Sequence, residues 1–489
     1  MDWMEHRAQQ LARFRESPLD VVVVGGGIVG AGVARDAALR GLRTGLIEQH
    51  DFAFGTSSRS SRLLHGGLRY LAQGRIGLVY QASHEKRVLH RIAPHLARPL
   101  RFIFPAYRGT GWPFWQLRVG VKLYDWLCGG RNFEPSRSLS REEVCERVPG
   151  LTDAGLTGAV QYCDALTNDA RLVLDTLRSA ATHGAVVCNY ACVEEPRPTD
   201  GGWQCRVRDT LARAEFVVRA RTVVHATGPW AERLPPSRVR LRLTKGVHVT
   251  VDRQRLPVPD AVVLPDGSRI LFTIPWGERV ILGTTDTDYD GPLDDVRTDS
   301  SDVALILEVV NRFFPEAKLT DYDVRSQWAG LRPLVDGRSG QPSDISRAHQ
   351  IRMPEPGWID VAGGKLTTYR LIAEHAVDLV CRHLASRNRT RARWTPCRTA
   401  DEPLLSGESN EAFSGILPPE VTREAVAHYC RNEWAVHLDD VMKRRTSWHF
   451  YRSDVEKVAE TVADWMAEIM SWDAARRDSE LQRYRQQVD

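Results

Sequence analysis

The stretch DVVVVGGGIVGAGVARDAALRGLRTGLIE, residues 20–48, restricts the possible folds of this chain more than any other feature. A run of four valines predicts a strand over residues 20–24, and a glycine turn separates it from a helix over about residues 29–39. A second strand is expected over residues 44–48. This order of elements predicts a βαβ unit with parallel strands.

Each glycine of this unit has a physical role in binding a dinucleotide. Gly25, Gly27 and Gly30 form the pattern GxGxxG, which permits a tight turn, close approach of a diphosphate and close packing of helix on strand. The helix N-terminus presents unpaired N–H groups and the positive end of its dipole to the diphosphate. Glu48 ends the second strand, where an acidic side chain can bind a hydroxyl of the adenosine ribose. We therefore expect a Rossmann-like dinucleotide site rather than a glycine-rich loop without a ligand.

The sequence after Glu48 favours FAD over NAD. An NAD-binding domain usually continues with alternating strands and helices, whereas this chain continues with the hydroxyl-rich FGTSSRSSRLLHGG. Two later modules, VVHATGP at residues 223–229 and DVAGGKLTTY at residues 360–369, repeat the pattern of a strand followed by glycine. A helix beginning near Gly364 would direct its positive end at a reduced flavin, which carries negative charge. Either module alone is also compatible with an ordinary sheet turn.

The segment SSRSSRLLHGGLRY, residues 57–70, is basic on both sides of two glycines. No acidic residue occurs between Asp51 and Glu85, although surface charge is usually mixed in sign. Gly66 and Gly67 allow the backbone to approach another group closely. The segment therefore predicts contact with an anion.

Composition and charge exclude several classes of protein. The chain has 489 residues, of which 42% are hydrophobic and 26% charged, and its net charge of +4 does not indicate nucleic-acid binding. Its nine cysteines form no CxxC pair, so we expect neither a disulfide framework nor a metal site. The N-terminus lacks an apolar signal region, and no apolar run approaches the roughly 20 residues that span a bilayer. We expect a cytoplasmic protein whose membrane contact is peripheral.

The remaining sequence alternates elements of a mixed α/β chain. A helix is expected from Asn168 or Asp169 to near Gly184. Residues 243–290 contain short β runs separated by turns, as in an antiparallel sheet. Residues 386–415 are polar and irregular and are typical of a linker, and the chain beyond them is helical and rich in charge.

Several motifs, occurring in order along the chain, together resemble the FAD-dependent, quinone-linked glycerol-3-phosphate dehydrogenases. They are GGGIVGAGVARDAALRGL, TSSRSSRLLHGGLRYL, DARLVL, ATGPW, TKGVHVTV, GTTDTDY, WAGLRPL and GGKLTTYRLIAEHA. HLDDVMKRRT, residues 437–446, is similar to the family's C-terminal domain, which is shorter here than usual. The resemblance implies oxidation of sn-glycerol 3-phosphate to dihydroxyacetone phosphate by hydride transfer from C2 to N5 of FAD, with the electrons passed on to membrane quinone.

The resemblance also implies a fold. We expect an α/β protein with a Rossmann-like FAD-binding domain of the glutathione-reductase and amino-oxidase type, an α+β cap domain that binds substrate, and an all-α C-terminal domain. The expected boundaries are residues 18–75, 156–235 and 341–385 for the discontinuous FAD-binding domain, 76–155 and 236–340 for the cap, 386–415 for the linker, and 416–489 for the C-terminal domain.

Glycerol 3-phosphate carries a phosphate that is costly to bury unless cations and hydrogen-bond donors surround it. Guanidinium groups match phosphate oxygens in a bidentate way, and Arg69 and Arg332 lie in the motifs HGGLRYL and WAGLRPL. The alternatives are a surface salt bridge for Arg69 and a structural contact within the cap for Arg332. The family motifs place around the substrate Arg69, Tyr70, Arg332 and Lys365, with Thr285 as a lesser candidate.

The resemblance assigns a larger set of residues to FAD. The hydroxyls of GTSSRSS are expected to wrap the pyrophosphate and the flavin edge, while the contacts of Arg59 and Arg62 are left open. The expected cofactor-binding residues are Gly25, Gly27, Gly30, Glu48, Thr56, Ser57, Ser58, His65, Gly66, Gly67, Thr227, Gly228, Gly364, Leu366 and Thr367.

Oxidation of an alcohol by a flavin requires removal of the hydroxyl proton as well as transfer of a hydride. Histidine commonly takes such a proton, because its pKa lies near neutrality. His248, in TKGVHVTV, matches the family position that we expect for this base, and Arg69, Arg332 and Lys365 complete the expected catalytic set. His65 is the competing candidate, and a structural role within a strand is the alternative for His248.

The stretch PFWQLRVGVKLYDWL, residues 113–127, combines basic and aromatic side chains. Read as a helix, it places Arg118, Lys122 and Asp125 on one stripe beside a wide apolar arc. Such a helix can lie in the surface of a bilayer or be half buried in a cap domain. Since quinone requires access to the bilayer, we expect contact with lipid at the inner face of the cell membrane through residues 108–131. A homodimer is a further candidate assembly.

Other functions are compatible with a flavin fold. An oxidase of glycerol 3-phosphate would pass electrons to oxygen, and its relatives carry a longer cap than this chain. A flavin amine or hydroxy-acid oxidase would bind a carboxylate, for which one arginine commonly suffices, and the set of Arg69, Arg332 and Lys365 argues against it. A non-catalytic flavin-binding redox sensor would bind FAD without being reduced by substrate.

Overall fold

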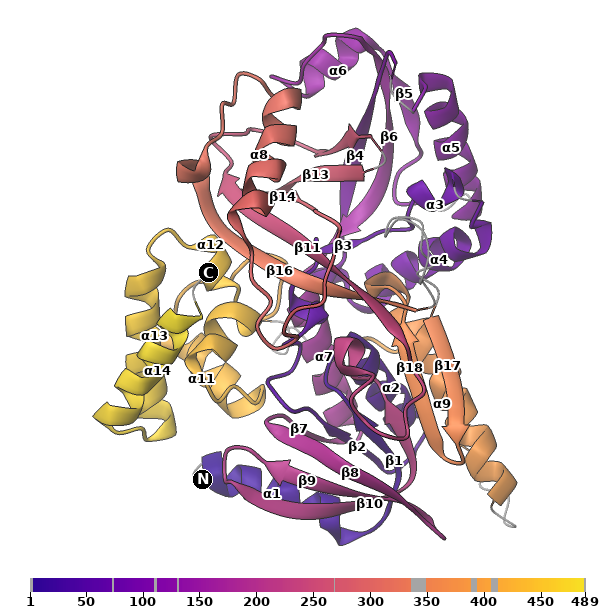
Figure 1. Ribbon diagram of the computed structural model, residues 1–489, viewed down its shortest axis with the longest axis vertical. Coiled ribbons are helices and arrows are strands. Elements are labelled where there is room, and N and C mark those ends of the chain that lie inside the picture. The colour runs from indigo at the N-terminus through magenta and orange to yellow at the C-terminus, as the bar shows by residue number, and fades with distance from the viewer. Residues whose placement is uncertain are drawn as a thin grey trace.

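The computed structural model contains two large β-sheets, one below the other in Figure 1, with a helical C-terminal domain beside them. It describes residues 3–72, 74–109, 112–129, 132–267, 269–335, 349–387, 394–405 and 412–487, apart from the side chains of residues 3–6, 69 and 72. The expected α/β class with a helical C-terminal domain is confirmed.

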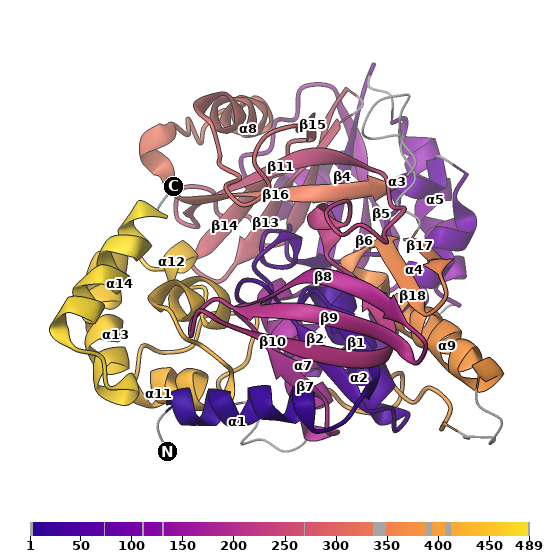
Figure 2. The same ribbon diagram turned by 60° about the horizontal axis from the view of Figure 1, so that its bottom comes forward.

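The lower sheet contains the predicted βαβ unit. It comprises β1 (Leu19–Val24), β2 (Thr44–Ile47), β7 (Val186–Cys188), β8 (Ala191–Thr199), β9 (Gly202–Asp209), β10 (Ala214–His225), β17 (His349–Glu355) and β18 (Trp358–Gly363). Helices α2 (Ile28–Leu39), α7 (Asp169–Thr182) and α9 (Tyr369–Arg387) cover one face, and α1 (Trp3–Glu16) lies on the other (Figure 2). Because β1 is buried on both faces, its run of valines does not alternate with polar residues.

Three glycine-containing turns meet at one edge of this sheet. Strands β18, β10, β1 and β2 are neighbours in that order and run parallel, so their carboxyl ends lie together. β1 ends at Val24, β10 at His225 and β18 at Gly363, and each leads directly into one of the three glycine modules of the sequence. The carboxyl edge of a parallel sheet at such a point is where open α/β folds bind ligands.

The upper sheet is largely antiparallel, as expected for residues 243–290. It comprises β3 (Leu63–Leu64), β4 (Arg98–Tyr107), β5 (Arg137–Leu139), β6 (Leu156–Leu166), β11 (Leu241–Asp252), β12 (Ala261–Asp266), β13 (Arg269–Trp276), β14 (Arg279–Gly283), β15 (Thr287–Asp288) and β16 (Val324–Val335). Strand β6 pairs with β4 along its length, so residues 156–166 belong to this sheet, although we expected the FAD-binding domain to resume at residue 156.

Helices flank both faces of the upper sheet (Figure 1). Helices α3 (Arg69–Ala72), α4 (Ile76–Ile92) and α5 (Phe114–Leu127) pack on one face, and α6 (Arg141–Arg147) and α8 (Ser300–Phe313) pack on the other. Leu117, Val121 and Tyr124 of α5 are buried against the sheet. Trp115 and Trp126 on its outer side are exposed.

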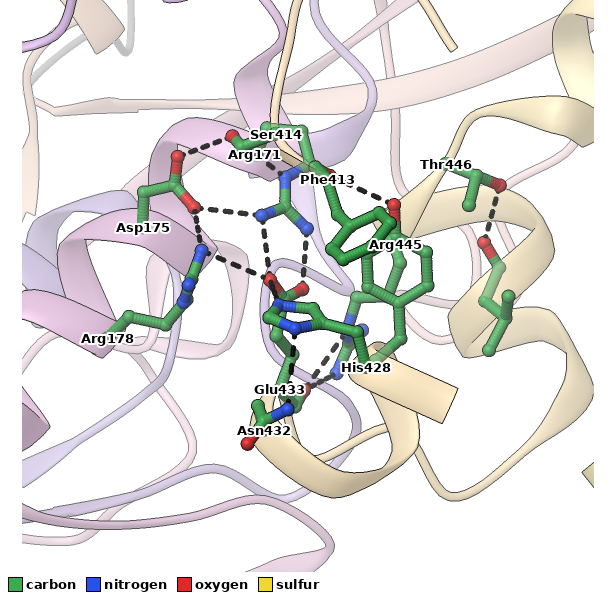
Figure 3. Close-up of polar contacts among 12 residues, drawn as sticks. Arg171, Asp175, Arg178, Phe413, Ser414, His428, Asn432, Glu433, Arg445 and Thr446 are labelled. Atoms are coloured by element: carbon green, nitrogen blue, oxygen red, sulfur yellow. Dashed lines mark hydrogen bonds and ion pairs between the residues drawn. The ribbon is translucent and has the colours of Figure 1, made fainter. Parts of the chain in front are cut away.

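The C-terminal domain contains α11 (Arg423–Asn432), the π-helical turn η7 (Asp440–Arg445), α12 (Trp448–Tyr451), α13 (Val455–Met470) and α14 (Ala474–Gln486). Figure 3 shows its junction with α7, where Arg171 lies between Asp175 and Glu433. The Arg171 guanidinium donates to both Glu433 oxygens, at 2.5 and 2.9 Å. Nearby, Arg445 pairs with Asp51 of the FAD-binding domain. Removing one partner of such a buried pair is strongly destabilising, so these contacts fix the C-terminal domain in place.

The described part of the segment expected to be a linker packs against the FAD-binding domain. Arg35 of α2 donates to the carbonyl oxygens of Thr399 at 3.3 Å and Glu402 at 2.6 Å. Leu404 is buried in the same core as α2. Residues 394–405 therefore extend the first domain rather than linking two separate ones.

Candidate functional site

A cavity of about 840 Å³ lies between the carboxyl edge of the lower sheet and the upper sheet. Its volume falls in the range of about 300–1,000 Å³ that is common for ligand and cofactor sites. The lining comes from all three glycine modules and from β11 and β16, and includes Gly25, Glu48, Thr227, Gly364, His248 and Arg332. A dinucleotide and a second ligand can therefore meet in one space.

The turn after β1 has the backbone geometry that a bound diphosphate requires. Gly25 has a φ of +109°, and a Cβ at this position would lie 2.5 Å from the carbonyl oxygen of Ala226. A Cβ on Gly30 would collide with the carbonyl oxygen of Gly25. Gly27 lines the cavity and directly precedes α2. The residues present thus fit a diphosphate at the N-terminus of α2.

Glu48 directly follows β2 and lines the same part of the cavity. Its carboxylate accepts the N–H groups of Gly26 at 2.6 Å and His50 at 2.8 Å. Burial raises the pKa of the Glu48 carboxyl, although these two N–H groups act in the opposite direction. The carboxylate is therefore held beside the glycine turn, where we expect the adenosine ribose.

The hydroxyl-rich segment at Thr56–Ser58 forms hydrogen bonds to α2 and to β16, close to the glycine turn that follows β1. Ser57 Oγ accepts the N–H of Ile28 at 3.0 Å, and Thr56 Oγ1 donates to the carbonyl oxygen of Leu331 on β16 at 2.6 Å. Thr56 and Ser57 line the cavity, whereas Ser58 lies outside the lining. The hydroxyls of Thr56 and Ser57 are thus placed where they can contact a dinucleotide that extends from the N-terminus of α2 towards the upper sheet.

The second glycine module contributes Thr227 and Gly228 to the cavity. The hydroxyl of Thr227 is 2.8 Å from Nε2 of His225, and Nδ1 of that histidine is 3.0 Å from Asp360. These two buried hydrogen bonds link Thr227, through His225, to Asp360 of β18.

The third module differs from the expected strand–glycine–helix order. A short 3₁₀ turn at Leu366–Thr368 follows Gly364, and α9 begins only at Tyr369. Gly364 and Leu366 line the cavity, as do His65 and Gly67 from the basic segment.

Two other expected cofactor residues form hydrogen bonds within or next to the segments that line this part of the cavity. Thr367 Oγ1 accepts the N–H of His65 and donates to its carbonyl oxygen, both at 3.1 Å. Gly66 donates its N–H to the hydroxyl of Tyr124 on α5 at 3.0 Å. Thr367 and Gly66 lie outside the cavity lining and hold the residues that form it.

His248 lies on β11 at the other end of the cavity, with 2% of its surface exposed. Its Nε2 is 2.7 Å from Ser61 Oγ, and its ring stacks on Trp328 with centroids 5.3 Å apart. Within the described residues, Nδ1 has no hydrogen-bond partner. Burial and the charges of Arg332 and Arg62 lower the pKa of His248 to about 3. The imidazole is therefore neutral at physiological pH and can accept a proton.

Arg332 projects into the cavity from β16 beside Gly246. Its guanidinium donates to Asp286 at 3.0 Å and to the hydroxyl of Thr284 at 2.7 Å. A Cβ on Gly246 would collide with this guanidinium, so the glycine leaves the space that Arg332 occupies. Asp286 and Thr284 therefore hold the Arg332 guanidinium in position before a ligand binds.

Thr285 differs from its neighbours in this loop. Thr284 and Asp286 line the cavity. The side chain of Thr285 is buried, and its hydroxyl accepts the N–H of Val247 at 3.0 Å. Thr284 therefore supplies the hydroxyl that faces the cavity, in place of the expected Thr285.

Lys365 and Tyr70 line the cavity together. The Lys365 ammonium lies 3.6 Å from the centroid of the Tyr70 ring, a favourable position for a cation over an aromatic face. His65 lines the same end of the cavity and remains the competing base. Arg69 begins α3, but its side chain lies outside the described residues, so its contact with substrate stays a prediction.

Sequence reasoning missed Trp328, although the alternation of WAGLRPL contains the signal. Trp328, Gly330 and Arg332 are two residues apart along β16 and share one face. They pair with His248, Gly246 and Thr244 of β11. If that motif is read as a strand, it places Trp328 beside His248, and the Arg332 side chain occupies the space over Gly246.

Family models match nearly the whole chain. The model described as "FAD dependent oxidoreductase" matches residues 20–379. The model described as "C-terminal domain of alpha-glycerophosphate oxidase" matches residues 400–477.

Individual proteins of known name align over most of the chain. A glycerol-3-phosphate dehydrogenase of Mycobacterium leprae is 35% identical, over 99% of this chain and 90% of that protein. An aerobic glycerol-3-phosphate dehydrogenase of Bacillus subtilis is 37% identical, over 83% of this chain and 75% of that protein. The X-ray structure of the glycerol-3-phosphate dehydrogenase from Bacillus halodurans complexed with FAD superposes with a TM-score of 0.79 and 30% identity, covering 99% of this chain and 97% of that chain.

Proposed function

The chain belongs to the family of FAD-dependent glycerol-3-phosphate dehydrogenases, and we propose that it oxidises sn-glycerol 3-phosphate to dihydroxyacetone phosphate and passes the electrons to a membrane quinone. FAD is its cofactor. The observation that carries the proposal is one cavity that is lined by the three glycine modules and also by His248, Arg332 and Lys365.

Arg332 and Lys365 are the groups that would bind the phosphate. Both line the cavity, and the Arg332 guanidinium is held by Asp286 and Thr284 in a fixed orientation. Guanidinium offers a planar pair of donors and ammonium a compact charge, which together suit a phosphate near two negative charges. Arg69 is proposed as a third cation from α3.

His248 is proposed as the base that removes the proton of the C2 hydroxyl. When bound, FAD would supply the acceptor for the hydride that leaves C2. His248 is neutral before substrate arrives, because burial and two arginines disfavour its protonated form. A phosphate bound at Arg332 would offset one of these positive charges and raise the pKa of the imidazole towards the working pH. Substrate binding would thereby strengthen the base that acts on it.

An apolar arm of the cavity supports quinone as the acceptor. Phe102, Phe104, Tyr162, Val263 and Phe272 line it from neighbouring strands of the upper sheet. The inner residues of α4 and α5 pack in the same apolar cluster. An apolar lining in the same cavity as the glycine modules, packed behind these helices, suits an aromatic, lipid-soluble acceptor.

The outer faces of α4 and α5 support contact with a membrane. Ile76 and Tyr80 of α4 are 49% and 55% exposed, and Trp115, Val119 and Trp126 of α5 are 65%, 61% and 72% exposed. The two helices lie side by side at one edge of the molecule (Figure 1). Large exposed apolar patches mark interaction surfaces, and tryptophan with lysine or arginine suits the lipid headgroup region. Among the described residues, no helix is long and apolar enough to cross a membrane.

Replacing Trp115 and Trp126 together with serine is expected to weaken binding to anionic phospholipid vesicles by at least about tenfold, since burying each large apolar side chain is worth roughly 1.5–3 kcal/mol. Co-sedimentation with vesicles measures this partition. Tyr322, which is 93% exposed and lies in the 3₁₀ turn Asp321–Asp323 rather than in α4 or α5, supplies the control Tyr322→Ser. Equal loss of binding in the control variant, or none in the tryptophan variant, would remove α5 as the lipid-binding helix.

Reoxidation of the reduced flavin tests the proposed acceptor. We expect a soluble short-chain quinone to restore the flavin absorbance quickly and oxygen to restore it slowly. Rapid reoxidation by oxygen with release of peroxide would instead make the protein an oxidase of glycerol 3-phosphate.

A further inference from the structure

Arg62 is a buried cation without an ion-pair partner in the described part of the chain. Its side chain is 2% exposed, and one of its terminal nitrogens, Nη1, forms no hydrogen bond there. The other, Nη2, donates to the hydroxyl of Ser447 at 3.1 Å. Buried charges are usually paired, because leaving one unpaired costs several kcal/mol. The charge of Arg62 is thus retained at a cost to stability.

Three aromatic rings surround this guanidinium. Its central carbon lies 4.4 Å from the ring centroid of Trp276, 5.7 Å from that of Trp328 and 5.9 Å from that of Phe450. Faces of aromatic rings attract cations, and the attraction is larger when both groups are shielded from water. This aromatic cage of Trp276, Trp328 and Phe450 stands where an ion-pair partner usually would, and Asp169, the carboxylate that acts on Arg62, forms no ion pair with it in the described residues.

The backbone at Arg62 is held in an unfavourable conformation. Its φ of +56° lies in the left-handed region, which is costly for a residue with a side chain. Its N–H donates to Ser60 Oγ at 3.0 Å, and its carbonyl oxygen accepts the N–H of Thr167 at 2.8 Å. This strain occurs in the same short segment that supplies Ser61, the hydrogen-bond partner of His248.

The C-terminal domain completes the cage. Ser447 directly precedes α12 and Phe450 lies within it, just after Arg445 and Thr446, which Figure 3 shows in the buried junction. The carbonyl oxygen of Phe450 accepts a hydrogen bond from Ser326 of β16 at 2.9 Å. Ser326 is two residues from Trp328 on that strand, so the C-terminal segment packs against the strand face that carries the ring stacked on His248.

We propose that Arg62, caged by the C-terminal domain, is a positioning residue that keeps the imidazole of His248 neutral and in place for proton abstraction. The proposal rests on the proposed role of His248 as the base. It also assigns a function to the C-terminal domain, which supplies one ring of the cage, Phe450, and the hydroxyl of Ser447 to which Arg62 donates.

The charges that face His248 come from two elements. The segment before β3 contributes Arg62 and the hydroxyl of Ser61, and β16 contributes Arg332. Gly283 of β14, which is uncharged, lies against the ring, and Asp169 of α7 acts on Arg62. Both arginines disfavour the protonated imidazole, so removing the charge of Arg62 must raise the pKa of His248. The imidazole would then become protonated, and inactive as a base, at a higher pH.

The variant Arg62→Met removes the charge and retains an apolar side chain of similar length. We expect it to fold with full FAD content and unchanged or higher thermal stability, because an apolar residue suits an aromatic cage better than an unpaired cation. Flavin reduction by glycerol 3-phosphate, followed by anaerobic stopped flow against pH, should lose rate at the acid end. The apparent pKa of this limb should rise by about one unit or more for loss of a buried neighbouring charge.

Two further variants separate charge from packing. Arg62→Lys keeps the charge and should leave the pH profile within about 0.3 unit of the parent. Arg279→Met also loosens the junction, because Arg279 donates to the carbonyl oxygen of Tyr451 at 2.9 Å, but its charge is paired with Asp252. No shift is expected for it. If Arg62→Met fails to fold, Phe450→Leu opens the cage to water, and the screened charge should give a smaller shift in the same direction.

Titration of His248 by NMR with labelled histidine, assigned through His248→Gln, provides the decisive readout. A raised pKa of His248 in Arg62→Met supports the coupling, even if the rate profile is unaffected and another group proves to be the base. An unchanged titration of His248 in folded Arg62→Met would overturn the proposal.

Discussion

Replacing His248 with alanine slows flavin reduction by glycerol 3-phosphate by about 10²–10⁴-fold, the usual contribution of a positioned general base. The expected loss is this large because His248 is neutral, is bound through one nitrogen to Ser61 and has its other nitrogen without a partner in the described residues. Affinity for substrate should change little, since Arg332 and Lys365 remain. Anaerobic stopped flow at saturating substrate measures the reduction rate directly.

The matched comparison is with His65, which lines the same cavity. We expect His65→Ala to reduce the rate much less than His248→Ala, once FAD content has been equalised. Near-normal reduction in His248→Ala together with a large loss in His65→Ala would transfer the role of base to His65 and make His248 structural.

Replacing Arg332 with alanine lowers kcat/KM for glycerol 3-phosphate by about 10²–10³-fold, as expected when a buried charge-assisted contact is truncated. Two effects combine in this loss. The phosphate loses a bidentate partner, and Asp286, which Arg332 neutralises at 3.0 Å, is left facing the incoming dianion. Most of the loss should therefore appear in KM. Steady-state kinetics with a soluble quinone separates KM from kcat.

The control for Arg332 is another arginine on the paired strands. Arg242 of β11 forms an exposed ion pair with Asp288 at 2.6 Å and lies outside the cavity lining. Arg242→Ala should leave kcat/KM within about twofold, since exposed ion pairs contribute little. An Arg332→Ala enzyme with unchanged KM would show that the phosphate binds elsewhere in the cavity.

The elements that carry local patterns could be predicted from the sequence. The valine run and its glycines predicted β1 and α2 to within one residue, and Asn168 caps α7 as expected. His248 and Arg332 share a cavity because β11 and β16 pair in register, and their motifs identified each residue without that pairing. Motif reasoning therefore identified residues that line the cavity but not how the strands bring them together.

The contacts that escaped prediction depend on distant parts of the chain. Arg62 is surrounded by Trp276, Trp328 and Phe450, and no local sequence pattern predicts that these three distant residues meet. Its left-handed backbone has no sequence signal, because the residue is not glycine. β6 joins the upper sheet through pairing with β4, which a boundary drawn from motif order alone does not reveal.

The most direct measurement is an anaerobic titration of the purified flavoprotein with sn-glycerol 3-phosphate, followed through the flavin absorbance. We predict complete bleaching by this substrate, and none by glycerol, which lacks the phosphate, or by glycine, which offers a carboxylate instead. Failure of glycerol 3-phosphate to bleach the flavin, or bleaching by glycine in its place, would contradict the proposed reaction.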